Sequence, residues 1–175
     1  MHTNTKKLVQ CALFAALLAA CSQLVIPLPM ISINLALFAV HLSGAVLGPR
    51  WGTAAVLVYI ALGACGVPVF LGFQGGLVYL FGKTGGYVLG YVFDALIVGF
   101  WSRSLGNSLA HLCAAMTIGV LTCYAFGTMW FMVLTGMGMM ESLMFCVIPF
   151  LPGDAVKIGL AAVTAKALER RRIFA

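Results

Sequence analysis

The sequence predicts an all-α membrane protein in which six transmembrane helices surround an outward-facing pocket capped by loops. Hydrophobic residues make up 63% of the 175-residue chain and charged residues only 8%, whereas soluble domains carry about 25% charged residues. The apolar residues form runs that are long enough for five or six spans. The basic residues lie between these runs. We therefore expect a single domain, residues 1–175, that crosses the cell membrane several times.

The first predicted span covers residues 8–26. Lys6 and Lys7 precede it, and Pro27 and Pro29 end it in a short turn, because proline interrupts helical hydrogen bonding. A basic start before an apolar run is also typical of a signal peptide. Since the chain continues as membrane sequence, we expect this span to be retained.

Small residues recur at helical spacing along the first span. Ala12, Ala16 and Ala20 form one stripe, and Ala15 and Ala19 form another. Such spacing lets a second helix approach closely. Two interpretations remain open: packing inside this protein, or a docking face for a partner membrane protein.

The second and third spans are predicted at residues 34–47 and 53–63, with a break at Gly48–Arg50. Because the second span is short, Ile31–Leu35 is expected to be extended. A glycine-rich segment, residues 63–86, follows the third span. Irregular backbone at membrane depth survives only when it is buried in protein or lines a cavity. The segment is therefore predicted to border a pocket.

Three further helices complete the prediction. The fourth span covers residues 86–101, the fifth covers 109–134, and the last helix runs from 153 to 170. Between the last two, residues 135–151 contain glycines and one short apolar stretch. We expect them to form a partly immersed loop or lid.

The basic residues orient these spans. Six spans place both termini on one side of the membrane, together with these basic residues: Lys6, Lys7, Arg50, Arg103, Lys166, Arg170, Arg171 and Arg172. Lys83 falls on the other side, and Lys157 lies near the start of the last helix. Lys and Arg concentrate on the cytoplasmic side. Both termini are therefore expected in the cytoplasm, and the pocket is expected to face outward.

An acid and a base lie in the first turns of the last helix. Asp154 and Lys157 follow Pro152, which a first turn tolerates, and residues three apart share nearly the same helix face. A charge placed in hydrocarbon costs about 2.5–3.5 kcal/mol. An ion pair that secures the helix end is one explanation. A polar substrate is the favoured one, since ionisable residues inside membranes usually serve function.

Other signals exclude several classes of protein. The segment Gly82–Thr84 resembles the end of a nucleotide-binding loop, but Leu77 stands where that motif needs its first glycine. The scattered cysteines and histidines predict no metal site or cofactor, and the basic residues form no patch for nucleic acid. No nucleophile–base constellation indicates an enzyme. Asp94 lies in the fourth span, and two interpretations remain open: it faces a neighbouring helix and caps a hydroxyl, or, as a lone intramembrane acid, it is a proton site of a secondary carrier.

Six short blocks spread along nearly the whole chain form a recognisable pattern: Ile26–Pro29, Gly44–Gly52, Gly66–Phe70, Thr84–Tyr87, Tyr124–Thr128 and Pro149–Asp154 with Lys157. In this order they resemble the BioY family, the biotin-binding S components of energy-coupling factor (ECF) transporters. The resemblance implies a six-helix fold with a biotin site near the outer face. It also implies a transmembrane coupling (T) subunit and two cytoplasmic ATPase subunits as partners. The coupling subunit is then expected to dock on Ala12, Ala16 and Ala20.

Two positions depart from the family pattern. Ala36 occupies the place of a glutamine, and Lys83 replaces a proline. If that glutamine contacts the ligand, either Asn34 substitutes for it or the substrate differs. The alternatives are therefore an S component for another vitamin and, in a different class, a proton-coupled carrier that uses Asp94.

With biotin as the expected substrate, each candidate residue receives a role. Asp154 accepts the two ureido N–H groups, and Lys157 donates to the carboxylate or to the ureido carbonyl. Asn34 and the glycine-rich segment supply further polar contacts, while aromatic rings pack against the ligand. The predicted substrate-binding residues are Asp154, Lys157, Asn34, Phe70, Gln74, Gly75, Gly85, Gly86, Tyr87, Phe126 and Trp130.

Overall fold

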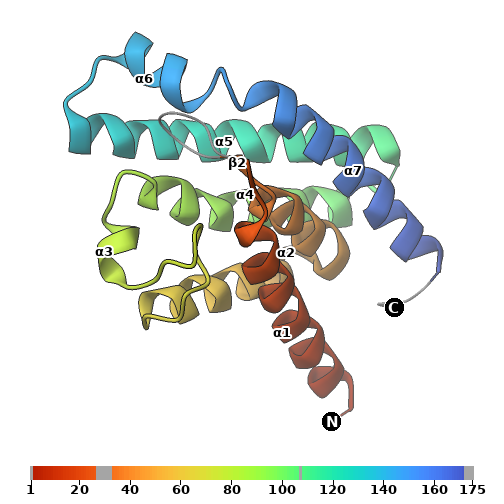
Figure 1. Cartoon of the computed structure of the whole chain (residues 1–175). Helices are drawn as coiled ribbons and strands as arrows, with labels where there is room; N and C mark the ends of the chain where they lie inside the picture. Colours follow the sequence, from red (N-terminus) through yellow and green to blue (C-terminus); the bar gives the residue numbers. More distant parts are fainter. Residues whose placement is uncertain (1, 27–32, 107, 172–175) are drawn as a thin grey trace.

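The computed structural model describes residues 2–26, 33–106 and 108–171. The predicted turn at Pro27 and Pro29, and the terminal Arg172, lie outside the described residues. The described chain is helical apart from its loops and one pair of very short strands (Figure 1). Its helices are α1 (His2–Gln23), α2 (Ala36–Ala64), α3 (Leu77–Leu80), α4 (Gly85–Ser104), α5 (Leu109–Thr135), α6 (Met139–Cys146) and α7 (Leu151–Arg170).

The strands β1 (Val25–Ile26) and β2 (Ile33–Asn34) pair antiparallel between α1 and α2. Val25 lies opposite Asn34 in this pairing. The backbone is therefore extended within the segment Ile31–Leu35, where the short second span predicted it.

Four helices are long and apolar enough to cross a membrane. They are Asn4–Gln23 of α1, Ala36–Ala64, Gly85–Ser104 and Leu109–Thr135. Helices α6 and α7, which meet at an angle of 52°, pass the same test when taken together. By length and composition, the described helices thus account for four or five spans, against the six that the sequence predicts.

The predicted break at Gly48–Arg50 lies inside α2. Gly48 has a φ of 80° and a ψ of −177°, which are not helical angles, and the first and second halves of α2 point in different directions (Figure 1). The Ser43 hydroxyl lies 3.4 Å from the Gly52 carbonyl oxygen, although nine residues of straight helix would separate them by about 13 Å. The chain therefore folds back sharply at Gly48. The next helical turn begins at once, because proline is tolerated there.

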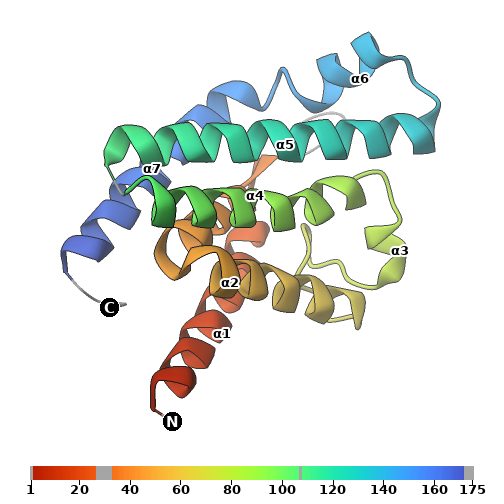
Figure 2. The same cartoon turned by 180° about the vertical axis from the view of Figure 1, so that it is seen from behind.

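Helix α4 lies between α2 and α5, and Figure 2 shows these three helices in successive layers. Glycines allow the close approach. A Cβ atom on Gly44 would lie 2.7 Å from the Ala95 carbonyl oxygen, and one on Gly90 would lie 2.9 Å from Cys123 Sγ. Small residues at helix contacts are typical of membrane proteins, where tight packing replaces the hydrophobic effect as the main attraction.

The segment between α2 and α4 is mostly irregular, as its glycines predict, with the single turn α3 inside it. Phe70 anchors this segment, because its ring is fully buried and packs where Gly63 lacks a side chain. A Cβ atom on Gly63 would lie 2.0 Å from the ring. The irregular segment is thus held against the end of α2.

The predicted lid, residues 135–151, contains the helix α6. Helix α7 begins at Leu151 with Pro152 in its first turn, which confirms the expected start of the last helix. Helix α7 packs against α2 and α5, and one face of its first turns, which carries Asp154 and Lys157, is buried.

Candidate functional site

A cavity of about 80 Å³ lies where the beginnings of α4 and α7 meet the middle of α5. Residues from six helices, strand β2 and three connecting segments line it, although they are far apart in the sequence. The lining residues are Asn34, Leu37, Tyr59, Leu71, Tyr79, Thr84, Tyr87, Val88, Tyr91, Cys123, Tyr124, Cys146, Phe150, Asp154 and Lys157.

Asp154 and Lys157 form a buried ion pair beside this cavity. The Lys157 ammonium lies 2.6 Å from Asp154 Oδ1, and the two residues are only 6% and 4% exposed. The Tyr124 hydroxyl donates to the second carboxylate oxygen, Oδ2. An ammonium carries three donors, so Lys157 retains donors for a molecule in the cavity. The two side chains thus pair with each other and also line the cavity.

Tyrosines form much of the cavity wall. Those that line it are Tyr59, Tyr79, Tyr87, Tyr91 and Tyr124. The Tyr87 hydroxyl lies 3.0 Å from Thr128 Oγ1, and its ring lies against Gly127, where a Cβ atom would approach within 2.3 Å. Burial raises the pKa of Tyr79, so its hydroxyl stays protonated near neutral pH. The wall thus combines flat apolar faces with a few hydroxyl groups.

Four predicted substrate-binding residues come together at the cavity: Asp154, Lys157, Asn34 and Tyr87. Asn34 enters from β2, just before α2. Its Oδ1 accepts a hydrogen bond from the Ala36 N–H at 3.3 Å, so its amide N–H groups remain available. Ala36 itself is fully buried and is not among the described lining residues.

The other predicted aromatic residues lie outside the cavity lining described for the structure. Phe70 stacks on Tyr79 with 4.8 Å between ring centroids, so it supports a lining tyrosine from behind. Phe126 packs against Phe93 at 5.5 Å. Trp130 donates its indole N–H to the Gly82 carbonyl oxygen at 3.0 Å. These contacts tie neighbouring elements together.

The predicted residues of the glycine-rich segment also lie outside the described lining. Gln74 pairs with Phe70 through backbone hydrogen bonds. Close contacts explain why three positions are glycine. A Cβ atom added at Gly75 would clash with the Val67 carbonyl oxygen, and one added at Gly85 with the Leu80 carbonyl oxygen. One added at Gly86 would clash with the Trp130 side chain. The absence of a side chain at these glycines lets neighbouring backbone and side-chain atoms pack closely against them.

The sequence reasoning missed several lining residues, above all Tyr91 and Tyr124. Tyr91 follows Tyr87 by four residues, and this spacing places both on one helix face. Tyr124 belongs to the motif block Tyr124–Thr128, from which Phe126 was chosen instead. For the cysteines in the lining, no local pattern in the sequence signals a role.

Asp94 faces the neighbouring helix α2, which is one of the two possibilities that the sequence left open. His41 Nδ1 of α2 lies 3.3 Å from Asp94 Oδ1 of α4, and both side chains are fully buried. Neither residue is among those described as lining the cavity. Within the described ranges, no group of three or more His, Cys, Asp or Glu residues is arranged to hold a metal ion.

Gly119 makes room for this buried pair, and replacing it with alanine should destabilise the protein. The new Cβ atom would lie 2.0 Å from Asp94 Oδ1, and overpacking of this kind costs about 1–3 kcal/mol. Unfolding in detergent, followed by tryptophan fluorescence, measures the loss. Gly159→Ala is the matched control, because nothing lies within 4 Å of its added Cβ. Equal stability of the two variants would contradict the prediction.

Comparisons with known proteins agree over nearly the whole chain. A model of the BioY family matches residues 1–173. The chain is 34% identical over 166 residues to a protein of Pyrococcus horikoshii named probable biotin transporter BioY, covering 95% of this chain and 98% of that protein. It is also 34% identical over 179 residues to the biotin transporter BioY of Rhizobium etli, covering 94% of each.

A solved structure has the same fold. It is the crystal structure at 2.1 Å of the S-component for biotin from an ECF-type ABC transporter, with a TM-score of 0.91 and 26% sequence identity. The match covers 97% of this chain and 93% of that chain. A family model over almost all residues and relatives above 30% identity together establish the relationship. This multi-pass membrane protein belongs to the BioY family.

Proposed function

We propose that this chain is the substrate-capture (S) subunit of a vitamin transporter in the cell membrane, and that it binds biotin in the tyrosine-lined cavity. One observation carries the proposal: the buried pair Asp154–Lys157 borders this cavity. Relatives named biotin transporters and the similarity to an S-component for biotin support the same substrate. A transporter subunit of this kind is not an enzyme, in line with the sequence.

The cavity chemistry suits the polar groups of biotin. The ureido ring has two N–H donors and one carbonyl acceptor, and the tail ends in a carboxylate. Asp154 accepts the ureido N–H groups, Lys157 donates to the carboxylate or the carbonyl, and the free amide of Asn34 adds a further contact. The tyrosine rings pack on the apolar faces of the ligand. Pockets of this composition are typical of small-molecule sites.

We also propose that the chain, as one domain of residues 1–175, crosses the membrane six times. The sharp reversal at Gly48 lets the two halves of α2 count as separate short spans, and α6 with α7 form the last one. An even number of spans places both termini on one side, which the basic residues make cytoplasmic. The biotin cavity lies at the opposite end and faces outward.

Uptake against a gradient requires partners, because the chain has no nucleotide-binding loop. The proposed partners are a transmembrane coupling subunit and two cytoplasmic ATPase subunits. The docking stripe on α1 supports this arrangement. Ala12, Ala16 and Ala20 are exposed, whereas Ala15 of the neighbouring stripe is buried inside the protein. The exposed small residues leave a surface onto which a partner helix fits closely.

Titration of the purified protein with biotin in detergent tests the substrate assignment. We expect saturable binding of one biotin per chain, and weaker or no binding of other water-soluble vitamins tested in parallel. Ala36, in place of the family glutamine, suggested another vitamin as the substrate. Its side chain is fully buried and its N–H donates to Asn34 Oδ1, so it does not favour a different ligand. Tighter binding of another vitamin than of biotin would overturn the assignment.

A further inference from the structure

A second cavity, of about 270 Å³, lies at the other end of the molecule. It is formed where the beginning of α1, the reversal in α2 and the end of α4 meet. Its described lining residues are Lys7, Gln10, Val46, Leu47, Pro49, Arg50, Trp51 and Arg103. Three of them are cations, and each comes from a different helical segment.

No acidic side chain of this protein neutralises these cations. The chain has four acids, all in the described ranges, and none lines this cavity. Asp94 lies beside His41, Asp154 beside Lys157, and Glu169 lies 3.1 Å from Lys166. Glu141 belongs to α6, near the biotin cavity. Among the described residues, Lys7, Arg50 and Arg103 therefore have no carboxylate side chain in their cavity, and these exposed cations are open to an anion from outside.

The position of Arg103 is built into the fold. Gly48 adopts a φ of 80°, and a Cβ atom there would lie 2.8 Å from Arg103 Nε and 3.4 Å from Nη2. The guanidinium group thus rests on the backbone at the reversal of α2, and only a glycine leaves it room. The planar guanidinium of Arg103, an exposed residue, presents several donors to one oxyanion.

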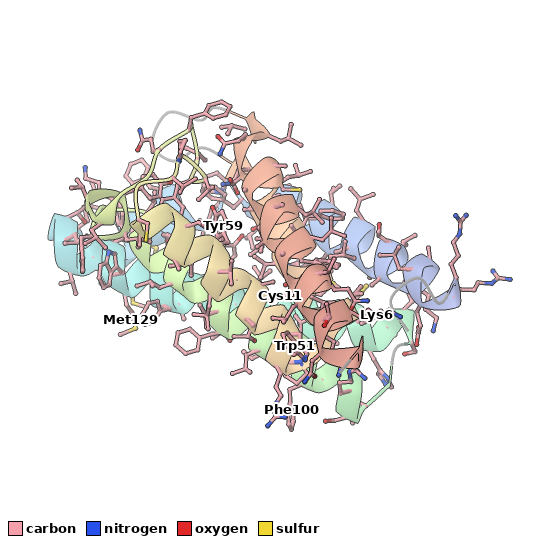
Figure 3. All side chains as sticks on the ribbon, turned by 90° about the horizontal axis from the view of Figure 1, so that it is seen from below. Lys6, Cys11, Trp51, Tyr59, Phe100 and Met129 are labelled. Atoms are coloured by element: carbon pink, nitrogen blue, oxygen red, sulfur yellow. The ribbon has the colours of Figure 1, made fainter. Side chains whose placement is uncertain are left out.

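The depth of the cavity points to the headgroup layer of the membrane. Thr84, which lines the biotin cavity, and Arg103 lie at opposite ends of α4, about 28 Å apart at the usual helical rise. This separation is close to the hydrocarbon thickness of a bilayer, about 30 Å. Trp51 lies near the first turns of α1 and Lys6, whereas Tyr59 lies farther along α2 (Figure 3). Tryptophan is enriched at this level of a membrane.

We propose that this second cavity binds the phosphate group of an anionic phospholipid. Phe100, on the last turns of α4, is 66% exposed and lies at the same end of the molecule (Figure 3). It provides an apolar surface for an acyl chain beside the cationic cavity. Basic pockets between helices on the cytoplasmic side are suited to anionic headgroups. The site holds lipid at the reversal of α2, away from the cavity that contains Asp154 and Lys157.

Native mass spectrometry of the full-length protein, with phosphatidylglycerol or phosphatidylcholine added, tests this proposal. We expect retention of phosphatidylglycerol in preference to phosphatidylcholine. Arg103→Gln should weaken phosphatidylglycerol binding about fivefold, and Arg50→Gln with Arg103→Gln about 25-fold, since each cation near a membrane surface contributes about a factor of five. Arg170→Gln, which removes a charge outside the cavity, should change binding less than about twofold. Unfolding temperatures of the variants establish that they are folded.

The remaining outcomes separate the possible anions. Inorganic phosphate at the same concentration should leave the lipid bound; displacement would keep the phosphate site but assign it to a soluble ligand. Equal retention of phosphatidylcholine, or an equal effect of Arg170→Gln, would overturn the proposal. A third outcome would also overturn the proposal: the unmodified protein binds no lipid, and the arginine variants lose the complex with the coupling subunit. The cavity would then bind an acidic group of that subunit.

Discussion

Replacing Lys157 with methionine should weaken biotin binding by roughly 10- to 150-fold. A hydrogen bond to a charged group contributes about 1.5–3 kcal/mol, and methionine keeps the length of the side chain without its donors. Asp154→Asn should have a similar effect, because the amide offers an N–H group where biotin also presents N–H groups. Isothermal titration calorimetry of the purified variants measures both changes.

The double variant Asp154→Asn with Lys157→Met separates a ligand contact from a purely structural ion pair. Removing one partner of a buried pair destabilises a protein by about 3–5 kcal/mol, because the other charge stays buried. Removing both charges should restore much of the stability lost in Lys157→Met, but not the affinity for biotin. If the double variant binds biotin as the unmodified protein does, the pair only secures the start of α7.

Enlarging the docking stripe should abolish most biotin uptake without affecting biotin binding. In Ala12→Leu with Ala16→Leu, two bulky side chains occupy the exposed face of α1. Overpacking costs about 1–3 kcal/mol at each position, so assembly with the coupling subunit should weaken by about tenfold or more. Uptake of radiolabelled biotin in cells that produce the coupling and ATPase subunits measures the effect.

Ala61→Leu provides the matched control for this experiment. Ala61 is also an exposed alanine in a membrane helix, but it belongs to the second half of α2 and not to the stripe. We expect normal uptake from this variant. An equal loss of uptake with Ala61→Leu, or normal uptake with the enlarged stripe, would show that the coupling subunit docks elsewhere.

The tyrosines that line the cavity beside Asp154 and Lys157 show which features the sequence does not predict. The helical repeat shows which residues share a face, so the sequence alone could predict that Tyr87 and Tyr91 lie on the same side of α4. It does not identify which face meets a cavity, because that depends on how α4 packs between α2 and α5. Phe126 and Trp130 are as aromatic as the tyrosines, yet they pack against Phe93 and Gly82.

The sequence by itself determined the features that depend on composition and on neighbours along the chain. These are the membrane class, the main helices, the break at Gly48 and the shared face of Asp154 and Lys157, since hydropathy, proline and helical spacing act locally. Only the tertiary structure decided which distant side chains meet. His41 lies beside Asp94, Tyr124 donates to Asp154, and Lys7, Arg50 and Arg103 line one cavity. Helix packing brings these residues together, although no sequence spacing relates them.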